Sequence, residues 1–344
     1  MKMNSLQFGK AMIAALFILL LNVVGVKNAL GQNQVAVLQH NDSIFAFYGV
    51  NAFQQANNAA TDGDIITLSS GDFNSCDITK AITLHGAGMV SDTLGVLQTR
   101  INGLFYISIS NNTEHLNIEG VYFAGSAYLG LDLNFAKFTR CYFEEFSCYH
   151  YYYTSQSHYL YNVAFYNCLI NGSNIYSASD SVVFYNCVLN SFLNNSQSSS
   201  PTVFAYNSII IPISYNYYNY SLYLYNCIIG GKVSFIQSQY ADHCILIGET
   251  FPSTVSAFDC MSVNSYEEVF ENWNGAFSID EDYSLKAQIA NSFLGNDGSQ
   301  VGIFGGAMPF NPRPTYLRPY RCNLSGYTTT DGYLNVDVEV APEE

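Results

Sequence analysis

Val182-Val-Phe184-Tyr-Asn186-Cys187-Val-Leu189 is one copy of an eight-residue pattern that recurs along this 344-residue chain. The pattern reads apolar, any residue, apolar, any residue, turn residue, small or apolar, any residue, apolar. Nine intervals separate the turn residues, with a mean period near 19 residues. The turn residues are Gly86, Gly103, Gly120, Arg140, Asn167, Asn186, Asn207, Asn226, His243 and Asp259.

The turn residues share a backbone property. All but Arg140 are Gly, Asn, Asp or His, the residue types that reach positive φ most readily. A residue in that conformation between two short strands bends the chain sharply. The alternating apolar residues on both sides of the bend then share one inward face.

The repeat length decides between repeat architectures. A period near 19 is too short for a helical-hairpin repeat, and the segments lack the leucine-rich signature. They are β-branched and aromatic, with Ser, Asn and Gly between them, which favours strands stacked in parallel register. The sequence therefore predicts an all-β fold, a single-stranded parallel β-helix of about ten coils.

Two further columns follow from the same register. The position after the turn is expected to form an interior stack of free, buried thiols, because side chains in parallel register rarely suit the disulfide dihedral. The position two after the turn faces outward and is apolar or aromatic, so we expect a cover over it. The C-terminal segment is the favoured cover, and a partner chain is the alternative. The thiol column is Cys141, Cys168, Cys187, Ser208, Cys227, Cys244 and Cys260. The outward column is Tyr122, Tyr142, Leu169, Val188, Ile209, Ile228 and Ile245.

Both ends of such a coil stack need covering, because each end presents an open strand edge. Apolar residues at Val50, Phe53, Ala56 and Ala60 have helical spacing and predict an N-terminal capping helix. Alternation over residues 333–340 predicts a terminal strand, which we expect to form a C-terminal β cap.

The opening and closing stretches carry a family resemblance. Asp62-Gly-Asp-Ile-Ile-Thr-Leu68 after the helix, and Ile82-Thr-Leu-His-Gly-Ala-Gly88, resemble the start of the pectin lyase-like, right-handed parallel β-helix proteins. Tyr283-Ser-Leu285 and Gly295-Asn-Asp-Gly-Ser-Gln-Val-Gly-Ile-Phe-Gly-Gly306 resemble the last coil of bacterial secreted members. The resemblance implies a right-handed coil. It implies no single activity, since this fold carries lyases, glycosidases, epimerases and adhesins.

The chain is expected to be exported. Residues 1–31 have a basic start, an apolar run over 11–26 and the small-residue site Ala29-Leu-Gly31, which are typical of a cleaved signal peptide. A membrane anchor is the alternative, but the apolar run is short for a span. The expected organisation is then a signal peptide (1–31), an N-terminal segment with the capping helix (32–62), the β-helix (63–310) and a C-terminal strand or tail (311–344).

The net charge of the chain limits the classes of partner that we expect. Cleavage leaves 9 basic and 27 acidic residues, a net charge of −18, which disfavours nucleic acid and anionic membrane surfaces. We expect an extracellular, cell-surface or periplasmic protein with no membrane span after cleavage, and a glycan or cell-surface protein as partner. The oligomeric state stays open.

Catalysis has weak support. Lyases on this fold need carboxylates for Ca²⁺ and a basic residue, and hydrolases need paired acids, but these coils are poor in charge. One coil and its following loop gather Asp132, Lys137, Arg140, Glu144, Glu145, His150 and His158. Lys137, Arg140, Glu144 and Glu145 are the weak catalytic candidates, for a polysaccharide lyase or glycoside hydrolase acting on an acidic polysaccharide. The plain alternative is a solvated surface loop.

The leading functional hypothesis is non-catalytic binding of a glycan or protein through aromatics. Tyr166, Tyr185, Tyr206 and Tyr225 each precede a turn Asn and should form an outward ladder. Tyr151 and Tyr152 add rings from a loop. Flat rings with polar tips suit sugar faces and binding surfaces. The alternatives are ring stacking that stabilises the coil, and a purely structural envelope component.

No cofactor and no metal site are expected. Asp280-Glu-Asp282 and Asn296-Asp297-Gly298 offer oxygens suited to Ca²⁺, but without the spacing of a binding loop. Turn chemistry explains both clusters, and Ca²⁺ stays a minor alternative.

Overall fold

The computed structural model describes residues 34–91, 97–110, 115–148, 158–175, 182–194, 202–212, 221–230, 239–253, 255–275, 277–314, 318–324 and 336–341. The predicted signal peptide, His150, Tyr151 and Tyr152 lie outside these residues. No helix in the described ranges is long and apolar enough to cross a membrane.

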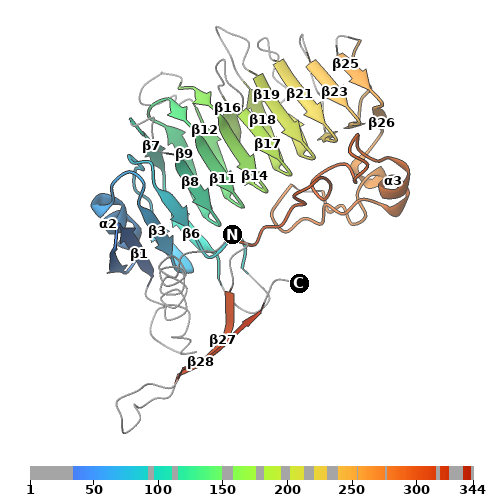
Figure 1. The fold of residues 1–344 in the computed structure, drawn as a ribbon. Helices are drawn as coiled ribbons and strands as arrows, with labels where there is room; N and C mark the ends of the chain where they lie inside the picture. The colour runs from blue at the N-terminus through green and yellow to red at the C-terminus, as the bar shows by residue number, and fades with distance from the viewer. Residues whose placement is uncertain are drawn as a thin grey trace, which may run out of the picture.

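The chain winds into a right-handed parallel β-solenoid whose coils stack side by side (Figure 1). One long sheet, sheet A, has twelve strands, and its last ten follow one another in parallel. In sheet order these ten are β3 (Ile65–Leu68), β5 (Thr83–His85), β8 (Leu116–Glu119), β11 (Ala136–Thr139), β14 (Val163–Tyr166), β17 (Val182–Tyr185), β19 (Thr202–Tyr206), β21 (Ser221–Tyr225), β23 (Gln239–Asp242) and β25 (Val255–Phe258).

The second long sheet, sheet B, contains the strand that follows each bend. Its strands are β4 (Gly71–Asn74), β6 (Thr99–Asn102), β9 (Tyr122–Leu129), β12 (Tyr142–Ser147), β15 (Leu169–Ile170), β18 (Val188–Asn194), β20 (Ile209–Pro212), β22 (Ile228–Gly230), β24 (Ile245–Ile247) and β26 (Met261–Val263). Two short strands, β7 (Phe105–Ile107) and β16 (Ser173–Ile175), extend this sheet, and β10 (Leu133–Asn134) pairs with β13 (Leu160–Tyr161) in a small third sheet.

Most of the predicted bends are present, but two are not: Gly86 does not take positive φ, and Gly103 follows β6 of sheet B instead of a strand of sheet A. Asn167, Asn186, Asn207 and Asn226 all have φ between 46° and 56°. The register pairs Tyr166 with Tyr185, Tyr185 with Tyr206, and Tyr206 with Tyr225. The asparagines that follow these tyrosines are therefore neighbours along the stack. Arg140 also takes positive φ, 51°, although its residue type does not favour it. The turn column is therefore a backbone feature of every coil from Arg140 to Asp259.

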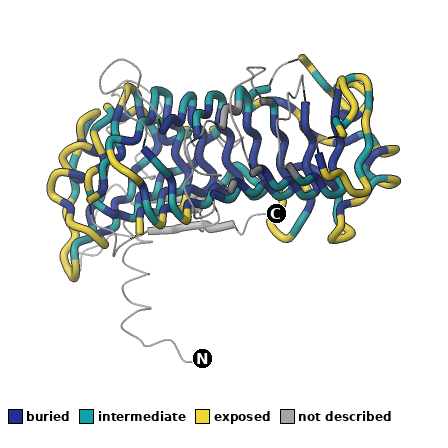
Figure 2. The backbone as a smooth tube through the Cα atoms, turned by 90° about the horizontal axis from the view of Figure 1, so that it is seen from above, coloured by how far each residue is buried: buried dark blue, intermediate teal, exposed yellow. Residues whose placement is uncertain are grey.

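The interior is filled by the apolar residues that flank each bend, which Figure 2 shows as a continuous buried layer. Phe138, Phe165 and Phe184 stack in register with ring centroids 4.9 Å apart. The expected thiol column is confirmed: the cysteines of this column are all free, and all but the partly exposed Cys260 are buried. Burial raises the pKa of Cys141, Cys168 and Cys244, so these thiols serve as packing groups.

The N-terminal end is closed by more than the expected helix. Helix α2 (Ala52–Ala59) buries Ala52, Phe53 and Ala56. Before it, β1 (Val35–His40) and β2 (Ser43–Tyr48) form a hairpin, and β1 pairs antiparallel with β3. The hairpin, which the sequence analysis did not predict, supplies the strand that the first parallel coil lacks.

The closing stretch does not form a last coil. The parallel strands end with β26 at Val263, and the chain then folds back outside sheet B, where Figure 1 shows it passing beneath the last coils. This return segment, which we name the cover (residues 264–311), contains the 3-10 helix η1 (Tyr266–Glu268) and helix α3 (Ala287–Ser292). The expected β-helix range, residues 63–310, therefore contains two different structures: the parallel coils up to Val263 and the cover after it.

The cover buries the outward apolar column of sheet B. The prediction that the C-terminal segment covers this column, and not a partner chain, is therefore confirmed. Tyr142, Leu169, Val188, Ile209, Ile228 and Ile245 form one cluster with residues of the cover. The cover contributes Val269, Phe270, Tyr283, Leu285, Ile289, Val301 and Ile303. A cluster sealed on both sides explains why these strands are apolar on both faces.

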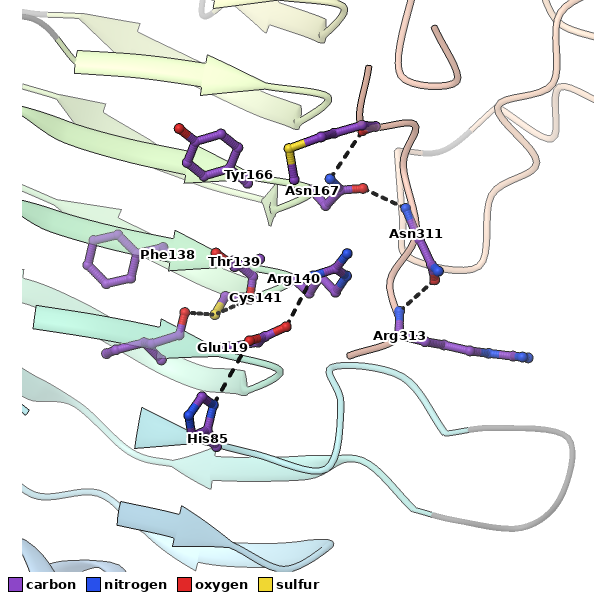
Figure 3. A network of polar contacts seen from close by, with 12 residues as sticks. His85, Glu119, Phe138, Thr139, Arg140, Cys141, Tyr166, Asn167, Asn311 and Arg313 are labelled. Atoms are coloured by element: carbon purple, nitrogen blue, oxygen red, sulfur yellow. Dashed lines mark hydrogen bonds and ion pairs between the residues drawn. The ribbon is translucent and has the colours of Figure 1, made fainter. Parts of the chain in front are cut away.

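The asparagine side chains fasten the final part of the cover, which we name the strap (residues 295–311). Asn186 Nδ2 donates to the carbonyls of Ile303 at 2.8 Å and Gly305 at 2.7 Å. Asn167 Oδ1 accepts from the backbone N–H of Asn311 at 2.6 Å, as Figure 3 shows. Asn207 donates to the Gln300 carbonyl. Each turn asparagine thus sets the bend with its backbone and holds the strap with its amide.

The C-terminal hairpin consists of β27 (Arg318–Leu324) and β28 (Val336–Ala341), paired antiparallel. The predicted terminal strand is therefore present in part. Figure 1 shows the hairpin below the coil stack, away from β25 and β26. The expectation that it covers the C-terminal end of the coil stack is not met.

Candidate functional site

The predicted tyrosine ladder exists on the outer face of sheet A. Tyr166, Tyr185, Tyr206 and Tyr225 stack with ring centroids 5.0, 5.0 and 4.9 Å apart. The rings are nearly parallel, at 8°, 12° and 9°. Parallel register fixes this spacing, because one residue per coil occupies each position of the column.

A second aromatic column lies beside the ladder and was missed in the sequence analysis. Phe204 stacks on Tyr223 at 5.1 Å, Tyr223 contacts Tyr240 at 6.2 Å, and Tyr240 contacts Phe258 at 5.3 Å. Phe204, Tyr223 and Tyr240 lie two residues before the ladder position or its equivalent in their strands. The same period-2 rule that located the ladder could therefore have found them.

The ladder's ring faces are covered by neighbouring side chains. Tyr185 and Tyr206 each lie between two other ladder rings. At one end, Lys137 Nζ lies 5.1 Å from the centroid of the Tyr166 ring, a cation–π contact. At the other end, Tyr240 lies against Tyr225 at 5.4 Å and 42°. The ladder therefore presents ring edges and hydroxyl tips, instead of the flat faces that the sequence analysis expected to meet a sugar.

The four ladder hydroxyls have no hydrogen-bond partner among the described residues, whereas other tyrosines do. Tyr122 donates to Glu144 and Tyr128 donates to Glu145. Burial, followed by the neighbouring Tyr185, raises the pKa of Tyr166 and Tyr206. These phenols stay protonated at neutral pH, and each can both donate and accept.

The catalytic candidates do not meet in one centre. Arg140 is 8% exposed, and its Nη1 pairs with Glu119 Oε1 at 3.1 Å (Figure 3). Glu119 also lies 3.9 Å from His85 Nδ1. Burial lowers the pKa of His85, and Glu119 opposes that shift in part. Arg140 thus pairs with a carboxylate at the end of β8, while Lys137 lies on the outer face of sheet A.

Glu144 and Glu145 lie together, at the irregularity where β12 shifts register against β9. Glu144 accepts from Tyr122 at 3.0 Å and Asn171 at 3.1 Å. Glu145 Oε2 accepts from Ser126 at 2.6 Å and Tyr128 at 3.1 Å. They border a polar cavity of about 350 Å³ whose described lining is Glu144, Glu145, Asn171, Gly172, Ser173, Asn174 and Ser191.

Glu144 and Glu145 are the charged side chains of the described lining of this cavity. Its described lining holds no Arg or Lys that could act as a lyase base. Both carboxylates already serve as acceptors for neighbouring side chains. Asp132 and His158, the other described members of the charged set, pair with each other at 3.5 Å. The arrangement is that of a polar corner bordered by hydrogen-bonded side chains.

No described group of three or more His, Cys, Asp or Glu side chains is arranged to hold a metal ion. In the acidic stretch at 280–282, Asp282 accepts from Asn272 and from the Ser284 backbone, as turn chemistry predicts. At 296–298, Asp297 accepts from the Ser299 backbone and hydroxyl.

Comparison of this chain with protein-family models, with curated proteins and with solved structures finds no match in any of the three.

Proposed function

We propose that this protein is an exported, non-catalytic β-helix of the pectin lyase-like type that binds a glycan on the outer face of sheet A. The observation that carries the proposal is the difference between the two long sheets. Sheet B is sealed by the cover, whereas the recorded ring contacts of the ladder all come from sheet A itself.

The regularity of this surface supports a glycan more than a protein. The ladder repeats one chemical group, a phenol, once per coil at a nearly constant spacing. A repeating surface is complementary to a repeating ligand, and polysaccharides are repeating polymers of hydroxyl groups. Protein surfaces also favour Tyr, but they bind through a few unique, fully desolvated anchors.

A glycan array with matched variants tests the proposal. The wild-type protein is expected to bind at least one glycan, and Tyr185→Ala combined with Tyr206→Ala is expected to abolish that binding. Tyr48→Ala is the control, because Tyr48 is 63% exposed but lies on the N-terminal hairpin. Circular dichroism checks that the double variant keeps its fold. Unchanged glycan binding by the double variant, or capture of a protein with no glycan bound, contradicts the proposal.

The second candidate function is a polysaccharide lyase or glycoside hydrolase, which the cavity at Glu144 and Glu145 favours. An assay for unsaturated or reducing sugar ends on acidic polysaccharides, with and without Ca²⁺, tests it. Turnover that is lost in both Glu144→Gln and Glu145→Gln would support this function. Turnover that survives both changes excludes these carboxylates.

A further inference from the structure

We infer that the glycan is an uncharged, linear polysaccharide that lies along the solenoid axis and is held by the row of four ladder hydroxyls. This inference rests on the proposed function and adds to it the class of ligand, its direction and the atoms that bind it.

The first step concerns the ring faces. Sugars commonly stack on an exposed aromatic face, but Tyr185 and Tyr206 have both faces covered by rings about 5.0 Å away. A glycan above the ladder can reach ring edges and hydroxyls. Recognition must therefore come mainly from hydrogen bonds at the tips.

The second step concerns those hydroxyls. None of the four has a hydrogen-bond partner among the described residues, so each hydroxyl is available to donate to a ligand and to accept from it. One phenol per coil places the hydroxyls in a single file. The four ring centroids span roughly 15 Å from Tyr166 to Tyr225. A polymer whose own hydroxyls recur along its length can meet several of these groups at once.

The third step concerns direction. Strands of neighbouring coils run side by side, and the ladder crosses them, so the file of hydroxyls runs along the stack of coils in Figure 1. An extended chain that bonds to successive hydroxyls must lie in the same direction, across β14, β17, β19 and β21.

The fourth step concerns charge. The strands β14, β17, β19 and β21 contain no charged residue. The nearest charges in register lie beyond the ends of the ladder, Lys137 one coil before Tyr166 and Asp242 one coil after Tyr225. A charged polymer would find no matching partners along the row, and the acidic chain as a whole repels polyanions. Neutral sugars match the surface.

The experiment measures affinity by calorimetry for neutral β-linked glucan, mannan, xylan and galactan oligosaccharides of two to six units. Carboxymethylated glucan and chitosan oligosaccharides are the anionic and cationic arms. Tyr185→Phe combined with Tyr206→Phe removes two hydroxyls and keeps both rings. Tyr223→Phe is the matched control, because it removes a hydroxyl from the neighbouring column of the same sheet.

We expect at least one neutral series to bind, with affinity rising from the disaccharide to the hexasaccharide. The double Phe variant should bind that series about 10- to 30-fold more weakly, from the loss of two ordinary hydrogen bonds. The control should bind as the wild type does.

Two results separate the inference from the proposed function. Wild-type affinity in the double Phe variant, with binding lost in the double Ala variant, overturns the hydroxyl row and leaves glycan binding in place. Preference for a charged arm overturns the neutral ligand. If no oligosaccharide of any arm binds the wild-type protein, the proposed function fails together with the inference.

Discussion

The turn asparagines have two separable roles: their backbone forms the bend, and their side-chain amide holds the strap. The sequence predicted the first role only. Positive φ at Asn167, Asn186, Asn207 and Asn226 follows from residue type and period, and the structure confirms it. The amide contacts could not be predicted, because Asn186 and its partner Gly305 are 119 positions apart and no local pattern links them. Glycine would satisfy the bend, so the choice of asparagine here reflects the strap.

Replacing Asn186 by Gly tests this division. Glycine keeps the bend but removes two hydrogen bonds to buried carbonyls, so we expect a loss of about 1–3 kcal/mol in the free energy of unfolding. Asn162→Gly is the control, since Asn162 has φ 53° and no recorded contact with the strap. Equal effects of the two changes in urea unfolding would show that the amide of Asn186 contributes nothing.

Arg140 is the exception to the turn rule, and the structure pairs it with Glu119. Its catalytic role stays a prediction. Arg140→Met should destabilise the protein by about 2–3 kcal/mol, because Glu119 is left without its partner in a partly buried site. Adding Glu119→Gln should recover part of that loss in thermal unfolding. A fully additive double variant would contradict the pairing.

Glu281 provides a pH dependence. Its side chain is buried, and among the described residues neither carboxylate oxygen has a hydrogen-bond partner of good geometry. Burial raises its pKa above the ordinary 4.5, although the backbone N–H groups of Asn274 and Asp282 oppose the shift. A raised folded pKa means that the folded state binds the proton more tightly. The contribution of Glu281 is therefore present below pH 4.5 and is lost as pH rises through the folded value.

Glu281→Gln should remove this pH-dependent contribution to the free energy of unfolding. We expect the variant to be more stable than the wild type at neutral pH, and the difference to shrink towards pH 4. Unfolding curves in denaturant at a series of pH values measure it. A stability difference that is constant with pH would show that Glu281 does not titrate in this way.

At the scale of elements, the strap explains the glycine-rich closing sequence. A Cβ at Gly305 would lie 1.6 Å from the Gln300 carbonyl oxygen and 2.7 Å from Asn207 Nδ2. The same closing sequence resembles a last coil, but it lies against sheet B as part of the cover. Which face such a segment packs against is a tertiary property.

Gly305→Ala should therefore loosen the strap. We expect faster hydrogen exchange over residues 295–311 and a loss of about 3 kcal/mol or more in stability. Gly172→Ala is the matched control, because its added Cβ would meet its nearest described neighbour, the Glu144 carbonyl oxygen, at 3.4 Å. Protection of the strap equal to that of the wild type would contradict the tight contact.

For the whole molecule, the outer faces of the two long sheets differ in exposure. Sheet B is buried by the cover and sheet A presents aromatics. A chain that ends at residue 263 would expose the apolar column of sheet B, and we expect it to aggregate. A chain that ends at residue 314 keeps the cover and should elute from a sizing column at the position expected for its mass relative to the full chain. Soluble, unchanged behaviour of the shorter chain would refute the role of the cover.

The coil, its bends, the thiol column and the ladder could be predicted because each repeats with the period of the coil. The N-terminal hairpin, the path of the cover and the partner of Arg140 do not repeat, so periodicity carried no signal for them. The ladder's location was predicted correctly, and ring stacking was one of the alternatives given for it, because parallel register sets the spacing of the rings.

The most direct measurement is a crystal structure of the protein with the bound oligosaccharide that the affinity series identifies. The sugar units should lie across β14, β17, β19 and β21, with their hydroxyls within hydrogen-bond distance of Tyr185 and Tyr206. Sugar bound in the cavity at Glu144 and Glu145, with the ladder unoccupied, would contradict the account.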